Sequence, residues 1–137
     1  KPFDIVEMSY GDQVLWPDHC IQGSMGAGFY PDLNHQRADA IIRKGSNPAV
    51  DSYSAFYEND KVTPTGLHGY LKNREVTKLT LVGLATDYCV AFSALDAAKL
   101  GYAVTVRLDM ARGIDSYGSL NAALDKMSKA GVNLVNG

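Results

Sequence analysis

The chain has 137 residues, 46% of them apolar and 20% charged, which is typical of one folded domain and excludes a disordered chain. Its 13 Lys and Arg against 15 Asp and Glu give a formal net charge of -2, so it lacks the basic surface that binds nucleic acid. No apolar run approaches the roughly 20 residues that cross a bilayer, and two cysteines are too few for a disulfide scaffold, which indicates a reducing, cytoplasmic location and no membrane partner.

The first 37 residues show little regular periodicity. Residues 1–14 have no sustained period, and residues 15–37 contain so many glycines and prolines that we expect a long ordered loop, which in a compact domain is usually functional. The chain opens on Lys1, without an initiator Met, in a stretch typical of a loop. We therefore expect it to be a piece of a longer protein.

Strands and helices alternate over the remainder of the chain. The apolar run 78–85 is typical of a buried parallel strand, and glycines end the last two helical stretches. The expected elements are strand 38–45, helix 63–76, strand 78–85, helix 86–101, strand 102–109, helix 118–131 and strand 132–136. This order predicts an α/β fold in which a parallel sheet carries helices on both faces.

Cys89 is the first candidate for chemistry. It follows the carboxyl end of strand 78–85, where open α/β sheets bind ligands, and it lies in the first turn of helix 86–101. The partial positive charge of a helix N-terminus favours the thiolate, the nucleophilic form of cysteine, and we expect Thr86 or Asp87 to cap this helix. The alternative is that Cys89 is a small core residue on a buried helix face.

Lys44 is the second candidate. It ends strand 38–45, so its charge is expected at the same edge of the sheet as Cys89. An ammonium group there would stabilise a thiolate and the negative charge that develops in a transition state. The alternative is a solvated lysine at a strand end.

The long loop and the segment after strand 38–45 carry further candidates. His19 could bind a metal ion, although a metal site needs at least two more ligands. Trp16, Tyr53 and Phe56 could line an aromatic pocket, or they could anchor the loops as core residues.

Four motifs occur together in an order that characterises one enzyme family. They are WPDHCIQGSMGA, IIRKG, DSYSAF and VGLATDYCV, at residues 16–27, 41–45, 51–56 and 82–90. Together they resemble the nicotinamidases (pyrazinamidases) of the isochorismatase-like cysteine hydrolases, over nearly all of the chain. Lys44, the SAF motif and the segment around Cys89 resemble the whole superfamily, whereas WPDHC indicates the nicotinamidase branch.

The resemblance implies an isochorismatase-like hydrolase domain over residues 1–137, incomplete in this chain. Its fold would be a Rossmann-like arrangement of three layers around a six-stranded parallel sheet. The implied activity is hydrolysis of nicotinamide, a small-molecule substrate, to nicotinate and ammonia in pyridine-nucleotide salvage, and the enzyme could be a homo-oligomer. Lys44 and Cys89 match two members of an Asp, Lys and Cys catalytic triad, and His19 matches one ligand of a divalent metal ion, which could be Zn, Fe or Mn.

The resemblance also assigns residues around the substrate. It implies a non-proline cis peptide bond between Leu84 and Ala85, and an oxyanion hole made by the backbone N–H groups of Ala85 and Cys89. Trp16 and Tyr53 match positions that contact the substrate ring.

The chain departs from the family before Trp16. The family's catalytic Asp lies on its first strand and its Asp-x-His metal pair follows the second strand, whereas Asp4 and Asp12 lie in a different sequence context. We expect that roughly the first third of the enzyme is absent, so that the chain by itself is inactive. The two missing strands would lie between strands 38–45 and 78–85 and leave a gap of about 10 Å with exposed apolar edges.

Two other interpretations stay open. The chain could belong to another isochorismatase-like cysteine hydrolase, such as a vinyl-ether hydrolase, which would not need His19. It could also be a non-catalytic binding domain, which the joint presence of Lys44 and Cys89 disfavours.

Overall fold

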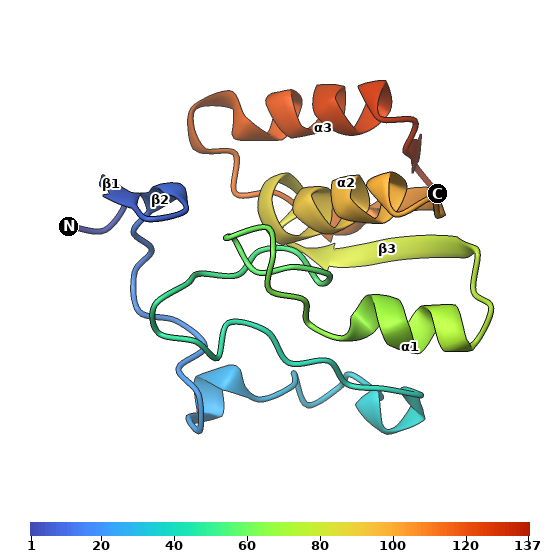
Figure 1. Ribbon diagram of the computed structural model, residues 1–137, viewed down its shortest axis with the longest axis horizontal. Helices are drawn as coiled ribbons and strands as arrows, with labels where there is room; N and C mark the ends of the chain where they lie inside the picture. The colour runs from blue at the N-terminus through green and yellow to red at the C-terminus, as the bar shows by residue number, and fades with distance from the viewer.

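The computed structural model describes all 137 residues, which form two sheets with three α-helices (Figure 1). The larger sheet contains three parallel strands in the order β3-β4-β5, and the smaller is an antiparallel hairpin of β1 and β2. The strands are β1 (Ile5–Met8), β2 (Gly11–Val14), β3 (Lys78–Leu84), β4 (Ala103–Arg112) and β5 (Asn133–Val135). The helices are α1 (Leu67–Asn73), α2 (Ala91–Lys99) and α3 (Ser119–Lys129). None of them is long and apolar enough to cross a membrane.

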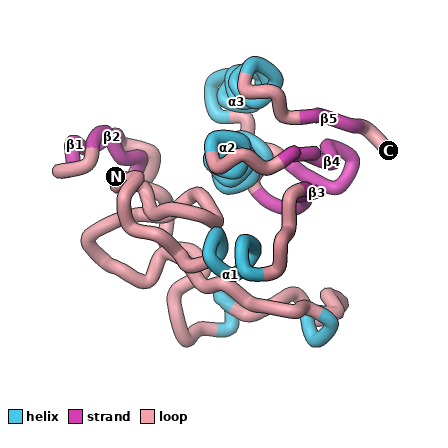
Figure 2. Tube along the Cα trace, turned by 45° about the vertical axis from the view of Figure 1, so that its right-hand side comes forward, coloured by secondary structure: helices cyan, strands magenta, loops and turns pink.

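The core lies between the parallel sheet and helices α2 and α3, which cover one face of it (Figure 2). Val104 and Val106 alternate along β4 toward the helices, as period-two side chains of a strand do, and both are buried. Ala94 and Ala97 of α2 and Met127 of α3 meet them and are fully buried. Small alanines on α2 let this helix approach the sheet closely, which positions the turn before it.

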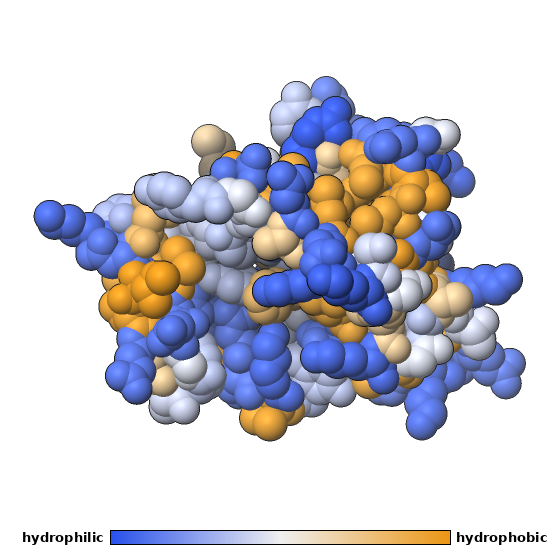
Figure 3. Space-filling view, turned by 90° about the horizontal axis from the view of Figure 1, so that it is seen from above, coloured by the Kyte–Doolittle hydropathy of each residue, from blue (hydrophilic) through white to orange (hydrophobic).

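The opposite face of the sheet is open. Side chains of Val82 and Leu84 on β3 are 53% and 73% exposed, and β3 pairs with a strand along one edge only. Apolar surface also gathers at the end of the molecule where the hairpin lies (Figure 3), and Phe3 and Ile5 are largely exposed there. The α/β class with a parallel sheet is confirmed, and three of its strands are present.

Several predicted element boundaries differ from the structure. The predicted strand 38–45 is wrong: these residues form no strand, because no neighbouring strand lies beside them to supply hydrogen bonds. The hairpin within residues 1–14 was not predicted, because two strands of four residues are too short to show a period. The predicted helix 63–76 forms only as the shorter α1.

The predicted helix 86–101 is divided into two parts. Its first turn, Thr86–Val90, is a π-helical turn in which the N–H of Val90 donates to the carbonyl oxygen of Ala85, and α2 begins directly after it. Neither Thr86 nor Asp87 caps the helix, because no side chain accepts a hydrogen bond at its first turn. The expected cap is therefore wrong, and the carboxylate of Asp87 has another role.

Candidate active site

Lys44 and Cys89 meet at the carboxyl end of β3. The Nζ atom of Lys44 lies 3.6 Å from Sγ of Cys89 and donates a hydrogen bond of 2.6 Å to the carbonyl oxygen of Ser52. Both side chains are partly buried, so solvent screens the ammonium only in part. At this separation the positive charge stabilises negative charge on the sulfur, and the pair is suited to nucleophilic chemistry.

A short buried segment, Ser52–Phe56, holds both members of this pair. The carbonyl oxygen of Ser52 fixes Lys44, as described above. Three residues further on, the N–H of Ala55 donates to Oγ of Ser93 at 2.8 Å, and this hydroxyl donates to the carbonyl oxygen of Cys89 at 2.6 Å. The same stretch of backbone therefore positions the lysine from one end and the turn that carries the cysteine from the other.

Asp87 ties that turn to the loop after β4. Its buried carboxylate accepts hydrogen bonds from the N–H groups of Ile114 and Asp115, at 3.0 and 2.8 Å, and from the hydroxyl of Ser119 at 2.5 Å. Gly113 permits this approach, because a Cβ at that position would lie 3.0 Å from the side chain of Leu120 and 3.4 Å from Oδ1 of Asp87. Burial by itself raises the pKa of Asp87, but the three hydrogen bonds outweigh it and leave the pKa below its ordinary value.

We expect Asp87→Asn to lower the free energy of unfolding by about 2 kcal/mol at neutral pH. The neutral amide replaces a buried carboxylate that accepts three hydrogen bonds, and it cannot accept all of them. Since the native pKa is depressed, the stabilisation is complete above the unfolded pKa of about 3.9 and is lost as the pH falls through the native value. Urea unfolding at pH 7, 5, 4 and 3 measures this. The difference between wild type and variant should be constant down to about pH 5 and shrink below pH 4; a difference that grows toward low pH would contradict it.

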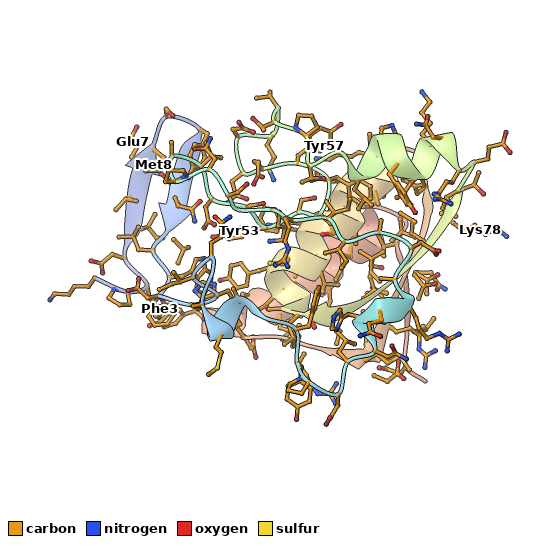
Figure 4. All side chains as sticks on the ribbon, turned by 90° about the horizontal axis from the view of Figure 1, so that it is seen from below. Phe3, Glu7, Met8, Tyr53, Tyr57 and Lys78 are labelled. Atoms are coloured by element: carbon orange, nitrogen blue, oxygen red, sulfur yellow. The ribbon has the colours of Figure 1, made fainter.

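An aromatic cluster forms around Tyr88, the residue directly before Cys89. The rings of Trp16 and Tyr88 meet edge to face with centroids 4.7 Å apart, and Tyr53 contacts Tyr88 at 5.7 Å and Phe92 at 5.1 Å. Tyr53 lies between the hairpin and α2 (Figure 4), where its hydroxyl accepts a hydrogen bond of 2.8 Å from Nε1 of Trp16. Burial, opposed by hydrogen bonds from Trp16 and Gln13, raises the pKa of the Tyr53 hydroxyl.

Sequence reasoning missed one member of the cluster, and for Phe56 the structure decides between the two alternatives left open. Tyr88 packs closely on Trp16, and its place directly before Cys89 is the signal that could have identified it. Phe56 is 2% exposed and packs in the core beside Tyr102, so it anchors the loop and lines no pocket with Trp16. Trp16 is partly exposed, whereas Tyr53 is buried, with 9% of its surface exposed.

The other residues predicted for the site lie as follows. The peptide bond between Leu84 and Ala85 is cis, and the N–H of Ala85 makes no backbone hydrogen bond. His19 is exposed, and its Nδ1 lies 2.6 Å from the carbonyl oxygen of Pro17. No three His, Cys, Asp or Glu side chains of the chain form a cluster that could hold a metal ion.

Comparison with known proteins identifies a family that the chain matches over nearly its whole length. Residues 6–136 match the family model of the isochorismatase domain. The chain is 47% identical to a nicotinamidase of Acinetobacter baylyi, over 99% of this chain and 64% of that protein. It therefore spans somewhat less than two thirds of the length of this relative.

Two solved structures are similar in fold. A nicotinamidase of Acinetobacter baumanii superposes with a TM-score of 0.97 at 51% identity, over 99% of this chain and 66% of the other. A pyrazinamidase of Pyrococcus horikoshii, solved in complex with zinc, superposes with a TM-score of 0.74 at 34% identity, over 89% of this chain and 63% of the other.

Proposed function

This chain belongs to the isochorismatase domain family, and we propose that it carries the nucleophile of a nicotinamidase, an amidohydrolase that converts nicotinamide to nicotinate and ammonia. The observation that carries the proposal is the 3.6 Å contact between Nζ of Lys44 and Sγ of Cys89 at the carboxyl end of β3. The aromatic cluster around Trp16, which includes the residue directly before Cys89, supports a flat aromatic substrate. The names of two relatives, both nicotinamidases, support the same substrate.

The proposed reaction proceeds through a thioester. A base takes the proton from Cys89, and the thiolate forms a C–S bond to the carbonyl carbon of the amide. Lys44 stabilises the anionic sulfur, and the N–H of Ala85, which is free of a backbone partner, donates to the oxyanion. The C–N bond breaks as the leaving nitrogen takes the proton back from the base, which releases ammonia. Water then attacks the thioester carbon and gives a proton to the same base. The C–S bond breaks, which releases nicotinate, and the base returns the proton to the sulfur of Cys89.

The base is the one part of this reaction that the chain does not supply. Lys44 donates to the carbonyl oxygen of Ser52 and contacts Cys89, and no carboxylate forms an ion pair with it or a hydrogen bond with Cys89. We propose that the base is the aspartate implied by the family resemblance, and that the 137-residue polypeptide does not turn over nicotinamide alone.

The experiment that tests the function is ammonia release from nicotinamide by the full product of the gene. We expect turnover by the full product and none by the isolated 137-residue polypeptide. Ammonia release from nicotinamide, with no pyruvate release from the vinyl ether isochorismate, assigns the nicotinamidase branch. Absence of amide hydrolysis by the full product would contradict the function, and turnover by the isolated polypeptide would contradict the missing base.

We propose His19 as a metal ligand of the complete protein, in keeping with the zinc-bound pyrazinamidase. The side chains of this chain do not by themselves fit a divalent ion, since no cluster of three ligands forms around His19. For this reason we derive no step of the reaction through a metal ion.

We expect His19→Ala to lower the bound zinc of the purified full product severalfold, because one ligand of a site contributes a large share of metal affinity. The measurement is metal content by mass spectrometry after dialysis. The matched control is His35→Ala, since Nδ1 of His35 also contacts a carbonyl oxygen, that of Leu33, at 3.2 Å. Equal zinc in both variants would remove His19 from the ligand set.

A further inference from the structure

A buried amide connects the hairpin to the segment that carries Tyr53. Gln13 on β2 is 5% exposed, and its Oε1 accepts a hydrogen bond of 2.9 Å from Nδ2 of Asn59. Its Nε2 lies 2.6 Å from Oδ2 of Asp51, 2.8 Å from the hydroxyl of Tyr53 and 2.8 Å from the carbonyl oxygen of Val14. The two hydrogens of Nε2 therefore lie among three acceptors, while Oε1 accepts from Asn59. These contacts fix the orientation of the Gln13 side chain.

The hydroxyl of Tyr53 transmits this constraint to Trp16. One oxygen atom accepts from Nε2 of Gln13 and from Nε1 of Trp16, each at 2.8 Å, so the amide and the indole are joined through a single atom. The indole in turn stands edge-on to Tyr88, the residue before Cys89. Without Gln13, the Tyr53 hydroxyl would keep only the contact to Trp16, and the position of both rings would be less restricted.

We propose that Gln13 is a positioning residue, which acts through the Tyr53 hydroxyl to hold the Trp16 ring in the orientation that an aromatic amide substrate packs against. The inference rests on the proposed function and extends it to a residue that does not touch the substrate. Lys44 is held by the carbonyl oxygen of Ser52, and no hydrogen bond joins it directly to Gln13. Gln13 therefore acts on substrate affinity and leaves the chemistry of Cys89 largely intact.

The test is steady-state hydrolysis of nicotinamide by Gln13→Leu in the full gene product, together with the fluorescence of Trp16. We expect KM to rise about tenfold, the equivalent of about 1.4 kcal/mol and of one hydrogen bond, while kcat stays within about twofold. Trp16 is the only tryptophan of this chain, and subtracting the spectrum of Trp16→Phe isolates its emission, which should shift to longer wavelength. Gln36→Leu, at an exposed glutamine, is the matched control and should change neither value.

A second variant covers the case in which Gln13→Leu does not fold. Gln13→Met has nearly the same length and no charge, but it lacks the N–H donors to Asp51 and Tyr53, and we expect the same rise in KM. In a Tyr53→Phe background, which removes the shared oxygen, Gln13→Met should raise KM no further.

Three results would overturn the inference: an unchanged KM with unchanged emission, a fall in kcat equal to the rise in KM, or additive effects with Tyr53→Phe. If the wild-type protein does not hydrolyse nicotinamide, the proposed function fails. The emission of Trp16 in Gln13→Met, Tyr53→Phe and the double variant then still decides whether Gln13 positions the indole.

Discussion

Cys89→Ser should reduce kcat for nicotinamide hydrolysis by a factor on the order of 10⁴ in the full gene product. The sulfur of Cys89 combines a lysine ammonium at 3.6 Å with a place at the carboxyl end of a parallel strand. A serine hydroxyl is a far weaker nucleophile at neutral pH, and nucleophile, base and electrostatic groups act as a unit, so the remaining parts cannot compensate. Initial rates of ammonia release measure the effect.

The matched control for this prediction is Cys20→Ser. Cys20 is the other cysteine of the chain and is exposed, so its replacement should leave kcat within about twofold. Mass spectrometry of the wild-type protein quenched with acid during turnover should also show a nicotinoyl adduct on Cys89. Full activity of Cys89→Ser would refute the thioester route.

Lys44→Met should lower kcat by about 10² to 10³, the loss that follows when one preorganised charged donor is removed from an active site. Methionine fills nearly the same volume, so the packing around Ser52 is retained while the positive charge next to Sγ of Cys89 is lost. A second measurement isolates this charge: alkylation of Cys89 by iodoacetamide at fixed pH should be slower in the variant, because the anionic sulfur is less stabilised.

Lys129→Met separates this effect from a general loss of positive charge. Lys129 is exposed and forms only a surface ion pair with Asp125 at 2.6 Å, so neither kcat nor the alkylation rate should change. Lys44→Arg keeps the charge, but the planar guanidinium does not fit a place built for a compact ammonium, and its activity should be intermediate. Unaltered alkylation in Lys44→Met would mean that the lysine does not act on the sulfur.

The spacing of apolar residues and the helix-ending glycines predicted those helices and strands that are long enough to show a period. The apolar run of β3 and the helix ended by Gly131 were predicted within a few residues of their observed limits, whereas the helix predicted over 86–101 is a π-helical turn followed by α2. Pattern failed for residues 38–45, because an extended segment becomes a strand only when a neighbour accepts and donates its hydrogen bonds. It failed for Asp87 as well, whose carboxylate reaches a loop about 27 residues away and not the start of its own helix.

The sequence by itself predicted the class of the fold, the family and the closeness of Lys44 to Cys89. Strand and helix periods are local properties, and Lys44 and Cys89 each follow a recognisable motif. Only the tertiary structure decided which groups position them. The carbonyl oxygen of Ser52 and the buried amide of Gln13 have no signature in the sequence, because backbone atoms are common to all residues and a glutamine acquires a role only from the partners that folding brings within hydrogen-bonding distance.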